Sequence, residues 1–120
     1  MAGIGIGLPG IVDSASGMMI SSRNHVPEFA GVALAADLRG STGLPVFVDN
    51  DVNAVALAES RFGVGRGAAS MAVLAVGTGV GSAIVLGGEI LHGRRGCAGE
   101  FGHVSIDFQG RPAGAAVVAA

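Results

Sequence analysis

Short apolar runs bounded by turn residues predict several strands along this chain. Residues 4–8 (IGIGL) are apolar and end at Pro9 and Gly10, as a buried strand does. The turn-forming stretch DSASG precedes residues 18–20, which favours a second strand there. Residues 46–48 (VFV) follow Pro45 and predict a third strand, which leads directly into a polar segment.

Two stretches show the spacing of amphipathic helices. Their apolar positions are Leu34, Ala35 and Leu38 in the first, and Val52, Val55, Ala56 and Phe62 in the second. We expect Gly40 and Gly43 to end the first helix. The second helix is predicted over residues 51–62, with an acidic first turn and Gly63 as its stop. Asp51 therefore stands where a strand ends and a helix begins, and ligands bind at such strand ends in open α/β sheets.

The uncharged stretch 67–88 allows two interpretations. It is long enough to cross a bilayer as a helix. Its centre, however, holds Gly77, Gly79 and Gly81 between valine-rich runs, and Gly87 and Gly88 follow. This pattern favours a strand, a turn and a second strand, with a hairpin at the glycine pair, and leaves the membrane helix as the minor alternative.

Composition narrows the class of protein. The chain has 120 residues, 22 glycines and no Trp or Tyr, which suits closely packed α/β structure in one small domain or pieces of two. Seven arginines and nine acidic residues give a net charge of −2, so no basic surface would attract nucleic acid. Cys97 stands alone, and the amino terminus lacks the features of a signal peptide. Both observations fit a cytoplasmic protein.

The segment VDNDVNAVALAE gathers carboxylates and amides at the predicted strand-to-helix junction. A carboxylate held there can accept a proton from a substrate hydroxyl, because the strand fixes it and the helix start is open to ligand. Asn50 can orient sugar hydroxyls by donating and accepting together. The alternative is that Asp49, Asn50 and Asp51 only cap the helix.

Two further segments carry weak signals on their own. VGTGVGS can bring backbone N–H groups to phosphate oxygens, with Thr78 and Ser82 as hydroxyl donors, or it is a plain tight hairpin. It matches neither a Walker A loop nor a dinucleotide fingerprint. GCAGEFGH sets Glu100 and His103 three apart among glycines, where they could grip sugar hydroxyls or simply lie on the surface. His25 and His92 have no obvious partner and are expected to be solvated.

In combination, GLPG, NDVNA, GTGVG and GEFGH resemble the ROK family of sugar kinases and sugar-responsive repressors, as far as about Pro112. The resemblance implies the ribonuclease H-like, actin-like ATPase fold, in which two α/β domains close on ATP and a sugar. Residues 1–66 would belong to the N-terminal domain, which carries the acceptor sugar and the catalytic base. Residues 67–112 would begin the C-terminal domain.

The resemblance also assigns roles. Asp51 would be the general base that takes the proton from the acceptor hydroxyl, commonly the 6-hydroxyl of a hexose. The sugar would be bound by Asn24, Asn50, Glu100 and His103. The ATP phosphates would contact Gly77, Thr78, Gly79 and Gly81. Magnesium would accompany the nucleotide, with no role assigned to Asp49, and complete members commonly form homodimers.

Two family elements are not found in these residues. One is the D-x-G-G-T phosphate loop expected upstream. The other is a cysteine cluster expected soon after GEFGH, whose thiolates join His103 in a structural zinc site. We hypothesise that residues 113–120 (AGAAVVAA) are that cluster translated after a one-base shift, although GC-rich reading frames yield such residues anyway.

These expectations favour an inactive fragment of a hexose kinase without bound zinc. The alternatives are the sugar-sensing part of a repressor, whose DNA-binding segment would lie upstream, and a non-functional gene remnant.

Overall fold

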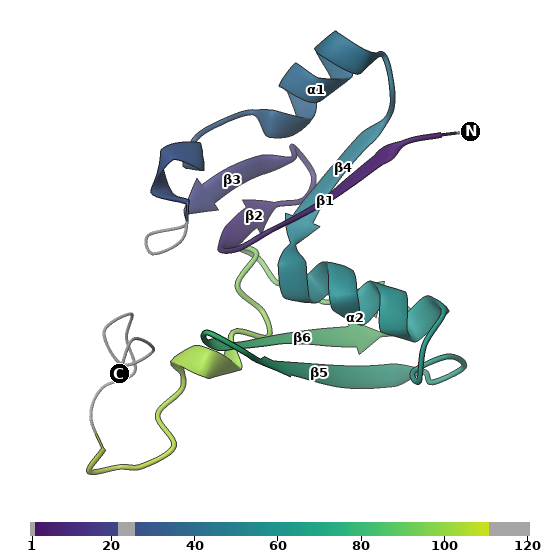
Figure 1. Ribbon diagram of the computed structural model, residues 1–120. Helices are drawn as coiled ribbons and strands as arrows, with labels where there is room; N and C mark the ends of the chain where they lie inside the picture. Colours follow the sequence, from purple (N-terminus) through teal and green to yellow (C-terminus); the bar gives the residue numbers. More distant parts are fainter. Residues whose placement is uncertain (1, 22–25, 111–120) are drawn as a thin grey trace.

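The computed structural model describes residues 2–21 and 26–110, which form a mixed α/β structure (Figure 1). Its elements in chain order are β1 (Ile4–Leu8), β2 (Ile11–Asp13), β3 (Met18–Ser21), the 3-10 helix η1 (Pro27–Phe29), α1 (Leu34–Thr42), β4 (Val46–Asn50), α2 (Asp51–Arg61), β5 (Ser70–Val76), β6 (Val80–Leu86), β7 (Glu89–Ile90) and the 3-10 helix η2 (Phe101–His103). The α/β expectation is thus confirmed.

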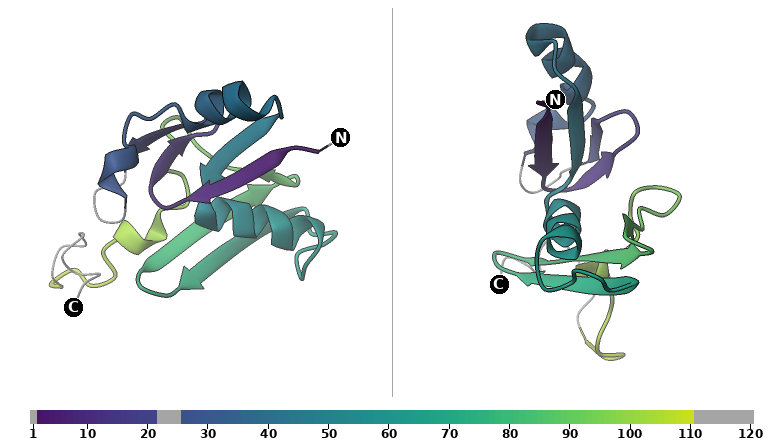
Figure 2. Two further views of the ribbon diagram at one scale, coloured as in Figure 1. Left: turned by 45° about the horizontal axis from the view of Figure 1, so that its top comes forward. Right: turned by 90° about the vertical axis from the view of Figure 1, so that its right-hand side faces the viewer.

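The strands pair in three groups. β1 runs parallel to β4, and β2 runs antiparallel to β3. β5, β6 and β7 form an antiparallel sheet in that order. Figure 2 shows α2 lying between the β1–β4 pair and the β5–β6 hairpin, which makes this helix the layer that joins the two halves.

Each half has its own apolar cluster. The first cluster consists of Val12, Ala35, Val46 and Val48, which come from β2, α1 and β4. The second consists of Ala56, Ala83 and Val85, so that α2 buries one face on β6. On the other face of the hairpin β5 is open to solvent, because its Leu74 and Val76 are 65% and 82% exposed.

Local sequence explains where α1 ends, and one prediction about it is wrong. Gly43 has φ +69° and its N–H donates to the Arg39 carbonyl at 2.9 Å, which is a left-handed helix cap. Gly40 was expected to share in ending the helix but lies inside α1. It is exposed, so the modest helix cost of a glycine is tolerated there.

The other predicted elements agree with the structure in kind and differ in extent. β4 continues beyond VFV to Asn50, and β2, which was not predicted, pairs with β3. The stretch 67–88 forms the predicted hairpin of β5 and β6 with the Gly87–Gly88 turn before β7. Within residues 2–21 and 26–110, no helix is long and apolar enough to cross a membrane.

Candidate functional site

The carboxyl ends of β1 and β4 lie side by side and carry the polar segment. Their parallel register pairs Gly7 with Asp49 and Leu8 with Asn50. Both strands therefore finish at one edge, where α2 begins immediately at Asp51. This is the strand-end position at which open α/β sheets bind ligands.

Asn50 caps α2 and ties its start to the loop after β1. Its Oδ1 accepts hydrogen bonds from the N–H groups of Val52 at 2.9 Å and Asn53 at 3.2 Å. Its Nδ2 donates to the Gly10 carbonyl at 3.0 Å. The capping interpretation is therefore confirmed for Asn50. One hydrogen of the amide remains for a ligand, because an NH₂ group can donate twice.

Asp49 and Asp51 differ in how many hydrogen bonds their carboxylates make within the protein. Oδ1 of Asp49 accepts from the backbone N–H of Asn50 at 2.7 Å and from Nδ2 of Asn53 at 2.9 Å, and its Oδ2 lies 2.7 Å from Nε2 of His92. Asp51 is exposed, and in the described part of the chain its carboxylate accepts only the Val52 N–H, at 2.9 Å. Asp51 is therefore the carboxylate available to a substrate.

Glycines let three chain segments approach the start of α2 and β6. A Cβ on Gly7 would lie 3.1 Å from Cα of Asp51, and one on Gly81 would lie 2.6 Å from Cγ2 of Val52. Gly102, inside the GEFGH segment, packs directly on the carbonyl of Val80. The end of β1 thus packs on the first turn of α2, and that turn, the glycine turn and η2 meet around residues 80 and 81.

The turn between β5 and β6 is open on its outer side. The N–H of Gly77 donates to the carbonyl of Gly79 at 2.9 Å, which closes the turn. A Cβ on Gly77 would meet no atom within 4 Å, and Thr78 is exposed. Backbone and hydroxyl groups here can be reached by a phosphate, so the residues fit that ligand. Ser82 does not: it is buried, and its hydroxyl bonds to the carbonyl of Gly99.

That serine holds the GEFGH segment on β6. Besides its bond to Gly99, its Oγ accepts the N–H of Phe101 at 2.9 Å. Gly99 has φ +90°, and a Cβ there would lie 3.2 Å from Cα of Ala83, so a larger residue would be strained. Nε2 of His103 lies 3.6 Å from Oε2 of Glu100, with 60% and 38% of these side chains exposed. Both groups remain accessible to a ligand.

The expectation that His92 is solvated without a partner is wrong. It pairs with Asp49, 43 residues away, and both side chains are partly buried, at 33% and 26% exposure. The sequence held no signal for this, because the contact depends on the tertiary packing. Asn24, His25 and the tail at 113–120 lie outside the described residues.

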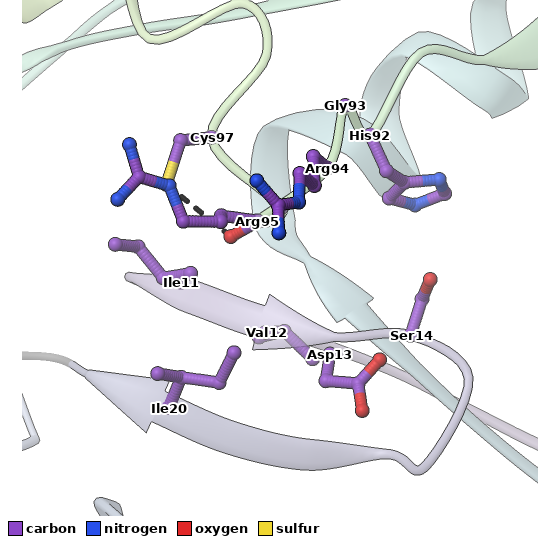
Figure 3. A pocket seen from close by; sticks show the side chains of 11 residues that line it. Ile11, Val12, Asp13, Ser14, Ile20, His92, Gly93, Arg94, Arg95 and Cys97 are labelled. Carbon is purple, nitrogen blue, oxygen red and sulfur yellow. Dashed lines mark hydrogen bonds between the residues drawn. The ribbon is translucent and has the colours of Figure 1, made fainter.

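A separate cavity of about 670 Å³ lies between the β2–β3 hairpin and the loop after β7 (Figure 3). Arg94 and Arg95 reach over it, and Ile11 and Ile20 lie across from them. Cys97 also borders it and is exposed, with Sγ donating to the carbonyl of Arg95 at 3.3 Å. Of the site residues predicted from sequence, those that the structure describes do not line this cavity.

The residues present do not fit a zinc site. Among residues 2–21 and 26–110, no three or more His, Cys, Asp or Glu side chains gather closely enough to hold a metal. The near neighbour of His103 is Glu100, and Cys97, the single cysteine of the sequence, donates its Sγ hydrogen to the Arg95 carbonyl. No step of the chemistry is therefore derived through zinc.

Comparison with known proteins identifies relatives of two kinds. The model of the ROK family matches residues 1–115. A glucokinase of Halalkalibacterium halodurans is 42% identical over 110 residues, which cover 92% of this chain and 33% of that protein. A putative xylose repressor of a Caldicellulosiruptor strain is 42% identical over 106 residues, covering 88% of this chain and 26% of that protein. The chain thus spans about a quarter to a third of the length of these relatives.

Solved structures agree. A ROK family glucokinase from Streptomyces griseus, in complex with glucose and AMPPNP, superposes with a TM-score of 0.77 and 36% identity over 89% of this chain and 34% of that one. The expected fold is confirmed: the chain adopts part of the actin-like ATPase fold of sugar kinases.

Proposed function

Because this chain belongs to the ROK family, we propose that it supplies the acceptor-sugar side of an ATP-dependent hexose kinase. The observation that supports this is the meeting of three segments at the start of β6. There the first turn of α2, which carries Asp51, touches Gly81 of the glycine turn, and Gly102 of the GEFGH segment packs on Val80. A base, a phosphate turn and sugar ligands within one region are what phosphoryl transfer to a sugar requires.

Asp51 acts as the general base in this proposal. Its exposed carboxylate takes the proton of a hexose hydroxyl as that oxygen bonds to the γ-phosphorus of ATP and the bond to ADP breaks. Asn50, fixed by its bonds to Val52 and Gly10, offers its second amide hydrogen to the sugar. Glu100 accepts from sugar hydroxyls, and His103 adds a further contact.

The outer edge of the glycine turn contacts the ATP phosphates in this proposal. A Cβ on Gly77 would meet no atom within 4 Å, so the backbone there can be approached closely, and the hydroxyl of Thr78 is a donor. Gly79 and Gly81 would add backbone contacts from the same turn. A magnesium ion carried in with the nucleotide would neutralise phosphate charge. No role at this ion is assigned to Asp49, whose Oδ1 accepts two hydrogen bonds from the protein and whose Oδ2 lies 2.7 Å from Nε2 of His92.

The proposal also covers the domains, location and assembly of the whole kinase. Residues 1–66 would belong to its N-terminal domain and residues 67–112 to the start of the C-terminal one. Asn24 would add a sugar contact from a segment outside the described residues. The enzyme would act in the cytoplasm, and a homodimer is the expected assembly.

A chimera tests the assigned base. Residues 1–110 of this chain replace the matched segment of the Streptomyces griseus glucokinase, and glucose-dependent ADP release is measured. We expect Asp51→Asn to lower kcat by about 100- to 10,000-fold, as loss of a general base does. Asp37→Asn, on the exposed part of α1, is the matched control and leaves kcat unchanged. Full activity of the Asp51→Asn chimera contradicts the proposal.

The second candidate is the sugar-sensing part of a repressor, favoured by the equally strong similarity to a putative xylose repressor. A chimera that binds glucose in calorimetry but releases no ADP supports it. The coding DNA upstream also separates the two. A D-x-G-G-T codon run favours the kinase, and a helix-turn-helix segment before it favours the repressor.

A further inference from the structure

We propose that Asp49 and His92 form a positioning pair that fixes the Asn50–Asp51 segment relative to the GEFGH segment. The inference rests on the proposed function, because it concerns the same site. The pair joins the end of β4 to the loop after β7. Its role is to set the separation between the base and the sugar ligands.

The β4 side of the pair is built to hold one carboxylate orientation. Nδ2 of the buried Asn53 donates to Oδ1 of Asp49 at 2.9 Å, and the backbone N–H of Asn50 donates to the same oxygen at 2.7 Å. These bonds leave Oδ2 facing His92. A carboxylate fixed by two donors is a rigid anchor, because its rotation would break both bonds.

The loop after β7 connects this fixed carboxylate to the segment that carries the proposed sugar ligands. A carboxylate oxygen only accepts, so Nε2 of His92 carries the hydrogen of the 2.7 Å bond. The carbonyl of the same histidine accepts the N–H of Ala98 at 3.1 Å, which closes the loop 92–98. The next residue, Gly99, bonds to the Ser82 hydroxyl, and Glu100 follows directly.

The two sides together make a continuous connection. Asp51 is two residues from Asp49, and Glu100 is two residues beyond the loop that His92 closes. The rigid bonds along this path leave little freedom between the base and the sugar carboxylate. Loss of the bond between Asp49 and His92 therefore frees the loop while the core of β5 and β6 stays intact.

The first experiment uses the 120-residue chain and backbone amide NMR. His92→Leu removes the hydrogen-bond donor, and we expect the amide resonances of Asp51 and Glu100 to shift and broaden together. His92→Gln keeps a donor and restores them. Arg61→Leu is the matched control, because the Arg61–Glu89 pair also joins α2 to the sheet, at 3.4 Å, and is exposed.

Three results overturn the inference. In the first, the Glu100 amide resonance shifts and broadens no more in His92→Leu than it does in the control Arg61→Leu. In the second, only residues beside position 92 respond. In the third, His92→Leu unfolds the chain, seen as loss of amide dispersion, which assigns the pair a purely structural role.

The second experiment measures catalysis in the chimera described above. We expect His92→Leu to lower kcat/KM for glucose by roughly 10- to 100-fold. A loss of about 100-fold is what a displacement of the reacting groups by about 1 Å can cause. His92→Gln recovers most of it. Unchanged kcat/KM in His92→Leu, with activity lost in Asp51→Asn, overturns the inference alone. Full activity in Asp51→Asn overturns the proposed function instead.

Discussion

Replacing Asn50 separates its capping role from its amide donor. In Asn50→Ala, the N–H groups of Val52 and Asn53 lose their acceptor, and the Gly10 carbonyl loses its donor. Loss of an N-cap costs about 1 kcal/mol. Loss of one hydrogen bond costs about 1 kcal/mol more. The free energy of unfolding should therefore fall by about 2 kcal/mol, which lowers the melting temperature of a domain this size by roughly 10 °C.

Asn50→Asp should cost less. Its carboxylate still accepts the two N–H groups at the start of α2, where the helix dipole favours a negative charge by about 0.3–1 kcal/mol. Only the bond to Gly10 is lost, so we expect a net loss below about 1 kcal/mol. Ser41→Ala, an exposed substitution on α1, is the control and should stay within about 0.5 kcal/mol.

Urea unfolding followed by circular dichroism measures all three variants. The slope of the transition should be the same in each, since none changes the buried surface much. The reasoning is refuted if Asn50→Asp destabilises as much as Asn50→Ala, or if Asn50→Ala costs no more than Ser41→Ala. In the first case the bond to Gly10 would carry the effect, and in the second the cap would contribute nothing.

Three further predictions concern other parts of the chain. Gly99→Ala should destabilise the chain by about 2–4 kcal/mol in thermal unfolding, because φ is +90° and the new Cβ would press on β6; a loss under 1 kcal/mol contradicts this. The hydroxyl of Ser16 holds the pKa of Asp13 below its ordinary 3.8, so Ser16→Ala should raise that pKa by NMR titration. The stabilisation linked to this shift is present above pH 3.8 and is lost as pH falls through the lowered pKa, and an unchanged pKa contradicts it. Breaking the exposed Arg61–Glu89 pair should change stability by less than about 0.5 kcal/mol in urea.

Sequence predicted the local elements well. The apolar spacing and the acidic first turn identified α2, and paired glycines identified the hairpin turns, because these signals act within a few residues. β2 was missed since three residues give no alternating pattern. The prediction that Gly40 helps to end α1 was wrong, because the sequence does not distinguish a glycine at an exposed position within a helix from one that ends it.

Long-range pairing could not be predicted in the same way. The parallel pairing of β1 with β4 joins segments separated by two strands and a helix. The residues of neither strand indicate which other strand it pairs with. The near-continuous apolar run of β5 is typical of a strand covered on both faces. In the described residues α2 covers one face only, and Leu74 and Val76 of the other are exposed.

The two carboxylates of the NDVNA segment show why a motif alone does not assign a role. Asp49 ends a strand, and its side chain is surrounded by donors from α2 and from the loop after β7. Asp51 begins a helix, where its carboxylate accepts the Val52 N–H and its side chain stays exposed. A base must be reachable by the substrate hydroxyl, whereas an anchor must not be. In the proposed function Asp51 is therefore the base and Asp49 the anchor, and the bond between His92 and Asp49 is the observation that supports this division.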